Sequence, residues 1–189
     1  YLAGLAKDLE GIVLNSAGGC DTNANAFAFA SSYLKKPIYC IDVPSRIPAE
    51  DVDAYQLKDT LLMIQFLEEQ TGHKLDFDKL GEMLEETRLQ MEIIQELQEM
   101  MTLVPSPVPS FYNLMQFVGY NICIGRPAFT ELLKVMHKTA KQNAEAGIPG
   151  SPSGQENVRL SFLLLDHYNL DLAFWSYLDE RGISHLGNC

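Results

Sequence analysis

The chain has 189 residues, of which 47% are hydrophobic and 21% charged, a composition that excludes long disorder and a collagen-like chain. Its 25 acidic and 14 basic residues give a net charge of −11, which disfavours binding to the phosphates of a nucleic acid. No apolar run approaches the roughly 20 residues of a membrane helix. The length corresponds to one or two domains that we expect to lie outside the membrane.

The first part of the chain predicts a strand, a helix and a second strand. Short apolar runs at residues 11–15 and 38–43 flank an Ala-rich stretch at 27–34. This alternation is typical of a βαβ unit, in which the two strands are parallel. We therefore assign residues 1–47 to the end of a first α/β domain, with further strands expected before residue 1.

Residues 48–147 predict a helical segment. Apolar residues recur at helical spacing over 52–71, 76–101, 110–122 and 127–146, with Gly72 and Gly147 as stops and Pro127 at a favourable first position. Ser110 is expected to cap the third helix, after a Pro-rich break. Residues 51–105 contain 13 acids and 4 bases, which favours a solvent-exposed acidic helix face beside a Met-rich core stripe.

Residues 148–155 predict a linker, because two prolines and two glycines occur in eight residues. Residues 156–189 then begin a second α/β domain, with a strand at 158–165, a helix at about 170–181 and a short strand at 183–186. The predicted fold class is α/β. Its strand–helix–strand units at both ends are parts of two Rossmann-like parallel-sheet domains that flank a long helical segment.

Cys20 is the strongest candidate for chemistry. It follows two glycines after the first strand and precedes a helix, and ligands of open α/β sheets bind at such turns. The partial positive charge of a helix N-terminus favours the thiolate, which ligates metals or attacks electrophiles. The alternative is an ordinary loop cysteine beside the capping residue Asp21.

The remaining cysteines and the histidines predict no further site. Cys40 and Cys123 lie in apolar stretches and are expected to be buried and inert, whereas Cys189 cannot be assigned. The four histidines lack the spacing of zinc ligands. Without a CxxC pair or a secretory leader, the cysteines favour a reduced, cytoplasmic protein.

Five segments in one order resemble the 2-hydroxyacyl-CoA dehydratase component D family, which includes 2-hydroxyglutaryl-CoA dehydratase and benzoyl-CoA reductase subunits. The resemblance spans nearly the whole chain. The segments are Cys20-Asp21 after a Gly turn, the strand at 37–44 ending in Asp-x-Pro, the LEE-x-TG segment at 67–76, Pro105-Ser106-Pro107, and the Glu-x-x-Arg segment at 156–159.

The resemblance implies a subunit with two α/β domains around a helical segment and a [4Fe-4S] cluster on three cysteines. Cys20 falls on one cluster ligand, and the other ligands are expected outside this chain, before residue 1 and beyond Cys189. Implied partners are an acyl-CoA substrate, a second homologous subunit in a heterodimer and an ATP-dependent iron–sulfur activator. The implied reaction is loss of water from a 2-hydroxyacyl-CoA through a ketyl radical.

Two alternatives stay open at the level of the sequence. One is a related reductase subunit, of the benzoyl-CoA type or with another small substrate. The other is a non-enzymatic binding or assembly module whose Met-rich helices contact a partner, which predicts an exposed apolar helix face and no iron.

Overall fold

The computed structural model describes residues 8–15, 21–42, 49–162 and 171–188. The chain forms two compact units, Tyr1–Asp76 and Phe77–Cys189. The four-part division predicted from the sequence stays a prediction.

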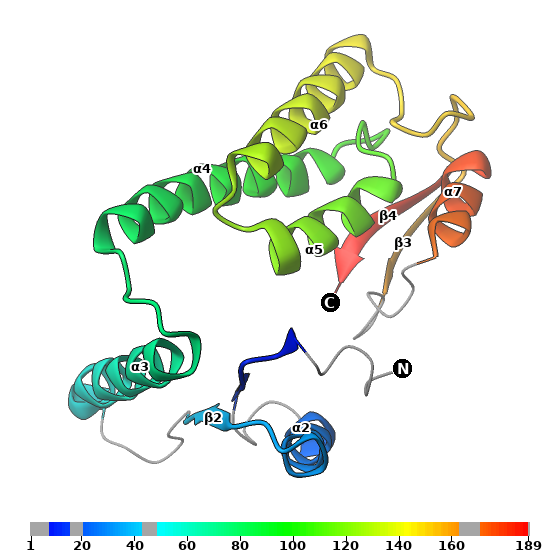
Figure 1. Ribbon diagram of the computed structural model, residues 1–189. Helices are drawn as coiled ribbons and strands as arrows, with labels where there is room; N and C mark the ends of the chain where they lie inside the picture. The colour runs from blue at the N-terminus through cyan, green and yellow to red at the C-terminus, as the bar shows by residue number, and fades with distance from the viewer. Residues whose placement is uncertain (1–7, 16–20, 43–48, 163–170, 189) are drawn as a thin grey trace. The chain divides into compact units, whose positions relative to one another are not determined.

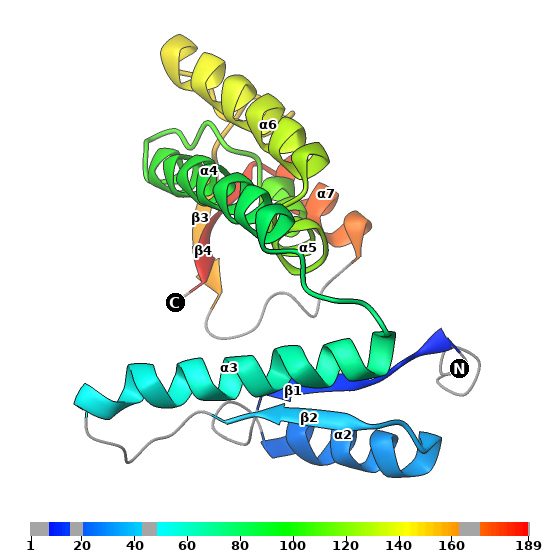
Figure 2. The same ribbon diagram turned by 60° about the vertical axis from the view of Figure 1, so that its left-hand side comes forward.

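The first unit is a small parallel sheet with a helix on each side. Its elements are β1 (Ile12–Asn15), α2 (Asp21–Leu34), β2 (Ile38–Ile41) and α3 (Ala49–Thr71). The strands are parallel, with Ile12 opposite Ile38, and they lie between α2 and α3 (Figures 1 and 2). Tyr39 contacts Phe66 of α3, with ring centroids 5.6 Å apart. The predicted strand–helix–strand unit is confirmed.

The second unit contains a helical part followed by a second parallel strand pair. Its elements are α4 (Phe77–Met101), α5 (Phe111–Cys123), α6 (Pro127–Ala146), β3 (Val158–Phe162), α7 (Leu172–Glu180) and β4 (Ile183–Asn188). Val158 lies opposite Ile183 in the parallel pair. The described residues therefore form a mixed α/β structure, with small parallel sheets towards both ends of the chain and a mainly helical centre, as the sequence predicts.

The main core of the second unit lies between α4 and α6. Leu97 and Leu133 are fully buried, and Met101 and Met136 are nearly so. The predicted apolar stripe of α4 is buried only in its C-terminal half, whereas Met83, Leu84 and Met91 remain exposed. The prediction was therefore correct for the half of α4 that packs against α6 and wrong for the other half.

The ends of α6 follow from its sequence. Pro127 occupies the start, where a missing N–H costs no helical hydrogen bond. Gly147 has a φ of 66° in the left-handed region, and its N–H donates to the carbonyl oxygen of Ala144. Both predicted boundaries are confirmed, because they depend on local backbone chemistry.

The Pro-Ser-Pro and Glu-x-x-Arg segments contact each other although 50 residues separate them. The Glu156 carboxylate accepts the backbone N–H of Ser106 at 3.0 Å and binds the Arg159 guanidinium at 3.0 Å. Arg159 also donates to three backbone carbonyls at the end of α4 and beyond it, those of Met101, Thr102 and Leu103. The segments thus join the end of α4 to the start of β3.

Residues 148–155 run alongside this junction. The N–H of Gly150 donates to the Ser106 carbonyl at 2.8 Å. A Cβ at Gly150 would lie 2.4 Å from the Pro107 carbonyl oxygen, a distance at which the backbone must shift. The side chain of Ser151 is buried and donates to the carbonyl of Asp179. Glycine is required here because two backbone segments approach closely.

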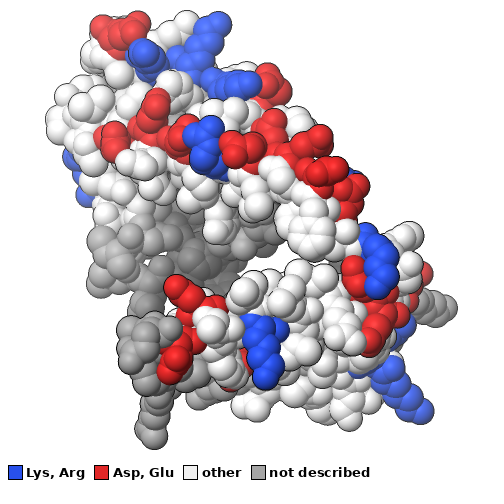
Figure 3. All heavy atoms as spheres, turned by 90° about the vertical axis from the view of Figure 1, so that its left-hand side faces the viewer, with Lys and Arg blue, Asp and Glu red and all other residues white. Residues whose placement is uncertain are grey.

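Acidic side chains form a row on the surface of α4 (Figure 3). Glu82, Glu85, Glu92, Glu96 and Glu99 are exposed, so the predicted acidic face is confirmed. Within the part of the chain that the structure describes, no helix combines the length and apolar character needed to cross a membrane.

Candidate functional site

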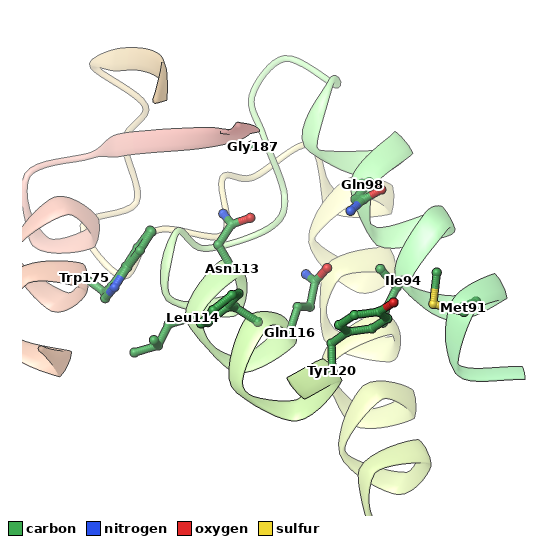
Figure 4. Close-up of a pocket in the computed structure, with 10 residues that line it drawn as sticks. Met91, Ile94, Gln98, Asn113, Leu114, Gln116, Tyr120, Trp175 and Gly187 are labelled. Atoms are coloured by element: carbon green, nitrogen blue, oxygen red, sulfur yellow. The ribbon is translucent and has the colours of Figure 1, made fainter. Parts of the chain in front are cut away.

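The candidate site is a cavity of about 360 Å³ inside the second unit. Helices α4 and α5 form most of its wall, and α7 and the end of β4 complete it (Figure 4). Its lining residues are Met91, Ile94, Gln98, Asn113, Leu114, Gln116, Phe117, Tyr120, Trp175 and Gly187. The volume lies at the lower end of the range for small-molecule sites.

The cavity lies beside the carboxyl end of a parallel strand. Gly187, the penultimate residue of β4, lines it with a φ of 105°, which only glycine adopts readily. Open α/β sheets bind ligands outside the carboxyl ends of their strands. The cavity therefore occupies a position at which such sheets commonly bind ligands, and it is a candidate site.

Polar but uncharged groups distinguish the lining. Gln98, Asn113 and Gln116 supply amides and Tyr120 a phenol, and none of the described lining residues is charged. Gln116 is 7% exposed, and its Nε2 has no hydrogen-bond partner among the described residues. In Figure 4 its amide points away from α5 into the cavity. Such a lining suits a neutral ligand that offers hydrogen-bond acceptors.

Helix α5 is held in place by α7 and β4. The carboxylate of Asp179, on α7, accepts the backbone N–H groups of Ser110 at 2.7 Å and Phe111 at 3.1 Å. The Ser110 hydroxyl instead donates to the Ile183 carbonyl and accepts the N–H of His185. Ser110 occupies the N-cap position of α5 as predicted, but its side chain makes no capping hydrogen bond, because Asp179 satisfies the start of α5 from another helix.

Burial of the contact between α7 and the start of α5 changes the pKa of Asp179. Asp179 is 5% exposed, and burial raises the pKa of its carboxyl group above the ordinary value. The N–H groups of Phe111 and Ser110 oppose this rise, because they stabilise the ionised form. The carboxylate thus positions α5, and with it Asn113 and Gln116.

A second polar cluster lies at the carboxyl end of β2 in the first unit. The Tyr39 hydroxyl donates to the Asp59 carboxylate at 2.7 Å, and the Tyr55 hydroxyl donates to Asp42 at 2.5 Å. The hydrogen bond to Asp59 raises the pKa of Tyr39 to about 12, with desolvation and the Asp59 charge adding to it. Tyr39 therefore stays protonated at neutral pH, and the cluster attaches α3 to β2 rather than supplying a base.

Cys20, the predicted ligand, lies outside the described residues. In the chain it stands between β1 and the first residue of α2. Across residues 8–15, 21–42, 49–162 and 171–188, no three or more His, Cys, Asp or Glu side chains come together to hold a metal ion. The described residues thus contain no complete cluster site, and Cys189 also lies outside them.

The prediction for Cys40 was wrong, since its side chain is exposed. Side chains alternate along a strand, and Tyr39 faces α3, so Cys40 points to the opposite side of β2. Cys123 is half-buried and packs against the α4–α6 core, which largely agrees with its prediction.

Sequence reasoning missed Gln116 and its neighbours. Asn113 and Gln116 are three residues apart on α5 and lie among apolar residues, so they share one face of the helix. That spacing was visible in the sequence. The part that Gln98 and Gly187 play in the cavity was not, since they come from distant segments.

The fold and the cavity define a mixed α/β protein with a candidate ligand site at the carboxyl end of a parallel strand. Residues 1–188 match the family described as 2-hydroxyglutaryl-CoA dehydratase, D-component. The chain belongs to this family of dehydratase subunits, as the resemblance indicated. A comparison with curated protein sequences gave no match.

Proposed function

We propose that the chain is part of an iron–sulfur subunit that eliminates water from a 2-hydroxyacyl-CoA by one-electron, ketyl-radical chemistry. The observation that carries the proposal is the family match over residues 1–188. When bound, a [4Fe-4S] cluster supplies single electrons of low potential, which the elimination needs because the β-hydrogen is too weakly acidic for a base alone. The uncharged cavity beside β4 is compatible with a neutral portion of such a substrate.

The residue proposed to bind the cluster is Cys20. Cysteine thiolates are the usual ligands of such clusters, and a helix N-terminus favours the thiolate form. Cys40 and Cys123 lie in different units and gather no other ligating groups among the described residues. We also propose a second homologous subunit and an ATP-hydrolysing iron–sulfur activator as partners, in a reducing cytoplasm.

Iron and acid-labile sulfide in protein purified without oxygen test this proposal. We expect about four of each per polypeptide that carries this chain together with the remaining cluster cysteines, and loss of both in Cys20→Ser, because the variant removes one thiolate ligand. The matched controls, Cys123→Ser and Cys40→Ser, should retain the parent content. Equal loss in Cys20→Ser and a control would reject Cys20 as a ligand. Absence of iron from the parent protein would favour the non-enzymatic binding module.

A further inference from the structure

We infer that the cavity between α4, α5 and β4 binds the pantetheine arm of coenzyme A, with the Gln116 amide donating a hydrogen bond to a carbonyl of that arm. The inference rests on the proposed function, because the coenzyme A substrate comes from it. The assignment of the arm to this cavity, and the role of Gln116, come from the geometry of the second unit.

Two buried glutamines in the unit, Gln90 and Gln116, differ in the hydrogen bonds of their amides. Gln90 is fully buried, and its amide is satisfied: Nε2 donates to the carbonyl of Arg126 at 3.0 Å and to Thr130 at 2.8 Å, while Oε1 accepts the N–H of Gly125 at 2.8 Å. Gln90 therefore holds the turn between α5 and α6 against α4. Its amide has a structural role.

Gln116 is also buried, at 7% exposure, but its amide is not fully hydrogen-bonded. Its Nε2 finds no partner among the described residues, and its side chain reaches the cavity (Figure 4). A buried donor without a partner destabilises a fold, whereas an apolar side chain of similar shape does not. An unpaired buried donor that points into a cavity is typical of a ligand site.

The lining matches the chemistry of a pantetheine arm. The arm is uncharged and carries two secondary amides, each with one donor and one acceptor, between methylene and methyl groups. Gln98, Asn113 and Gln116 offer both donors and acceptors, and Met91 and Phe117 offer apolar contacts. The nucleotide phosphates require cations, which the described lining residues do not supply, so the phosphates must lie outside the cavity.

The size of the cavity agrees with binding of the pantetheine arm alone, without the nucleotide. A volume of about 360 Å³ is small for a whole coenzyme A molecule. The competing occupant is water, which fills polar cavities of this size and can accept from a buried amide. Water alone is therefore the alternative that the experiment must separate from the arm.

Binding of pantetheine to the full chain, measured by titration calorimetry, tests the inference. We expect Gln116→Met to weaken binding about tenfold, which corresponds to one hydrogen bond. The same substitution should raise the midpoint of thermal unfolding by about 2–4 °C, because it removes an unsatisfied buried donor. Gln116→Glu keeps the shape but, as an ionised carboxylate, has no donor, so it should weaken binding as well.

The matched control is Gln95→Met on α4. Gln95 is exposed, and its amide donates to the Glu99 carboxylate at 3.0 Å. We expect both its pantetheine affinity and its unfolding midpoint to equal those of the parent. A gain in stability with a loss of binding at Gln116, and neither at Gln95, is a result that a purely structural glutamine would not produce.

The outcomes separate this inference from the proposed function. Pantetheine affinity that is equal in the parent and both Gln116 variants, or absent from the parent, overturns the inference and leaves water in the cavity. The iron content then still decides the proposed function. Gln116-dependent pantetheine binding in a protein without iron would instead retain the cavity assignment and reject the radical chemistry.

Discussion

Replacement of Arg159 with alanine should lower the free energy of unfolding of the Phe77–Cys189 unit by about 3–5 kcal/mol. The side chain of Glu156 is 7% exposed and would lose its cationic partner. The carbonyls of Met101, Thr102 and Leu103 would lose a shared donor as well. Urea unfolding followed by the fluorescence of Trp175 measures the change, because this single tryptophan is buried in the unit.

Two further variants define what the Arg159 junction requires. Arg159→Lys keeps the charge but loses the planar fork that reaches a carboxylate and several carbonyls together, so we expect an intermediate loss. Arg88→Ala removes ion pairs to Glu85 and Glu92 from a side chain that is 62% exposed, and should cost less than about 1 kcal/mol. A loss for Arg159→Ala no larger than that for Arg88→Ala would contradict the buried-junction interpretation.

The second large effect is expected at Asp179. Asp179→Ala should destabilise the same unit by about 2–4 kcal/mol, because two backbone N–H groups at the start of α5 lose a charged acceptor. Ser110 is fully buried, so water cannot replace the lost acceptor at its N–H. Trp175 fluorescence during urea unfolding again reports the change. Since α5 carries Asn113 and Gln116, pantetheine affinity should fall together with stability.

Asp171 provides the matched control for this prediction. It caps its own helix, α7, by accepting the N–H of Ala173 at 2.9 Å, and it is exposed. Asp171→Ala should cost about 1 kcal/mol, as at an ordinary helix cap. If Asp179→Ala costs no more than Asp171→Ala, the contact between α7 and α5 contributes nothing beyond a local cap.

Asp179 and Glu156 should give opposite pH dependences. Burial raises the pKa of Asp179, so its contribution to stability falls as the pH rises from 3.8 through the higher folded value. Burial also acts to raise the pKa of Glu156, but hydrogen bonds from Ser184, Ser106 and Arg159 outweigh it and lower that pKa. The stability that Glu156 contributes is therefore complete above 4.5 and lost as the pH falls through the lower folded value.

Urea unfolding of the parent, Asp179→Asn and Glu156→Gln across the acidic range measures these contributions. Each variant is neutral at its position, so subtracting its free energy of unfolding isolates one carboxyl group. With rising pH, the free energy of unfolding of the parent should fall relative to that of Asp179→Asn. It should rise relative to that of Glu156→Gln. Slopes of the same sign in the two comparisons would contradict the assignment.

The helices and strands were largely predictable, because their limits depend on neighbouring residues. Pro127 and Gly147 delimit α6 through the backbone angles that they favour. Apolar spacing located α4 and the parallel strands, since it records which side of each element can be buried. The family resemblance was likewise carried by short segments that the sequence shows directly.

Tertiary structure alone decided how these elements are joined. Ser110 precedes α5 as a capping residue should, yet the acceptor comes from Asp179, 69 residues away. Cys40 lies in an apolar strand, but alternation turns it to the exposed side of β2. Neither outcome can be read from local sequence, because a hydrogen bond or a buried face depends on which segment arrives opposite.

The candidate site shows the same division. The sequence by itself determined that α5 carries two amides, Asn113 and Gln116, three residues apart among apolar neighbours. Only the packing of α5 against α4 and β4 placed Gln98 and Gly187 across from them and formed a cavity. The physical reason is that helical spacing fixes which residues share a face, whereas long-range packing fixes what that face meets.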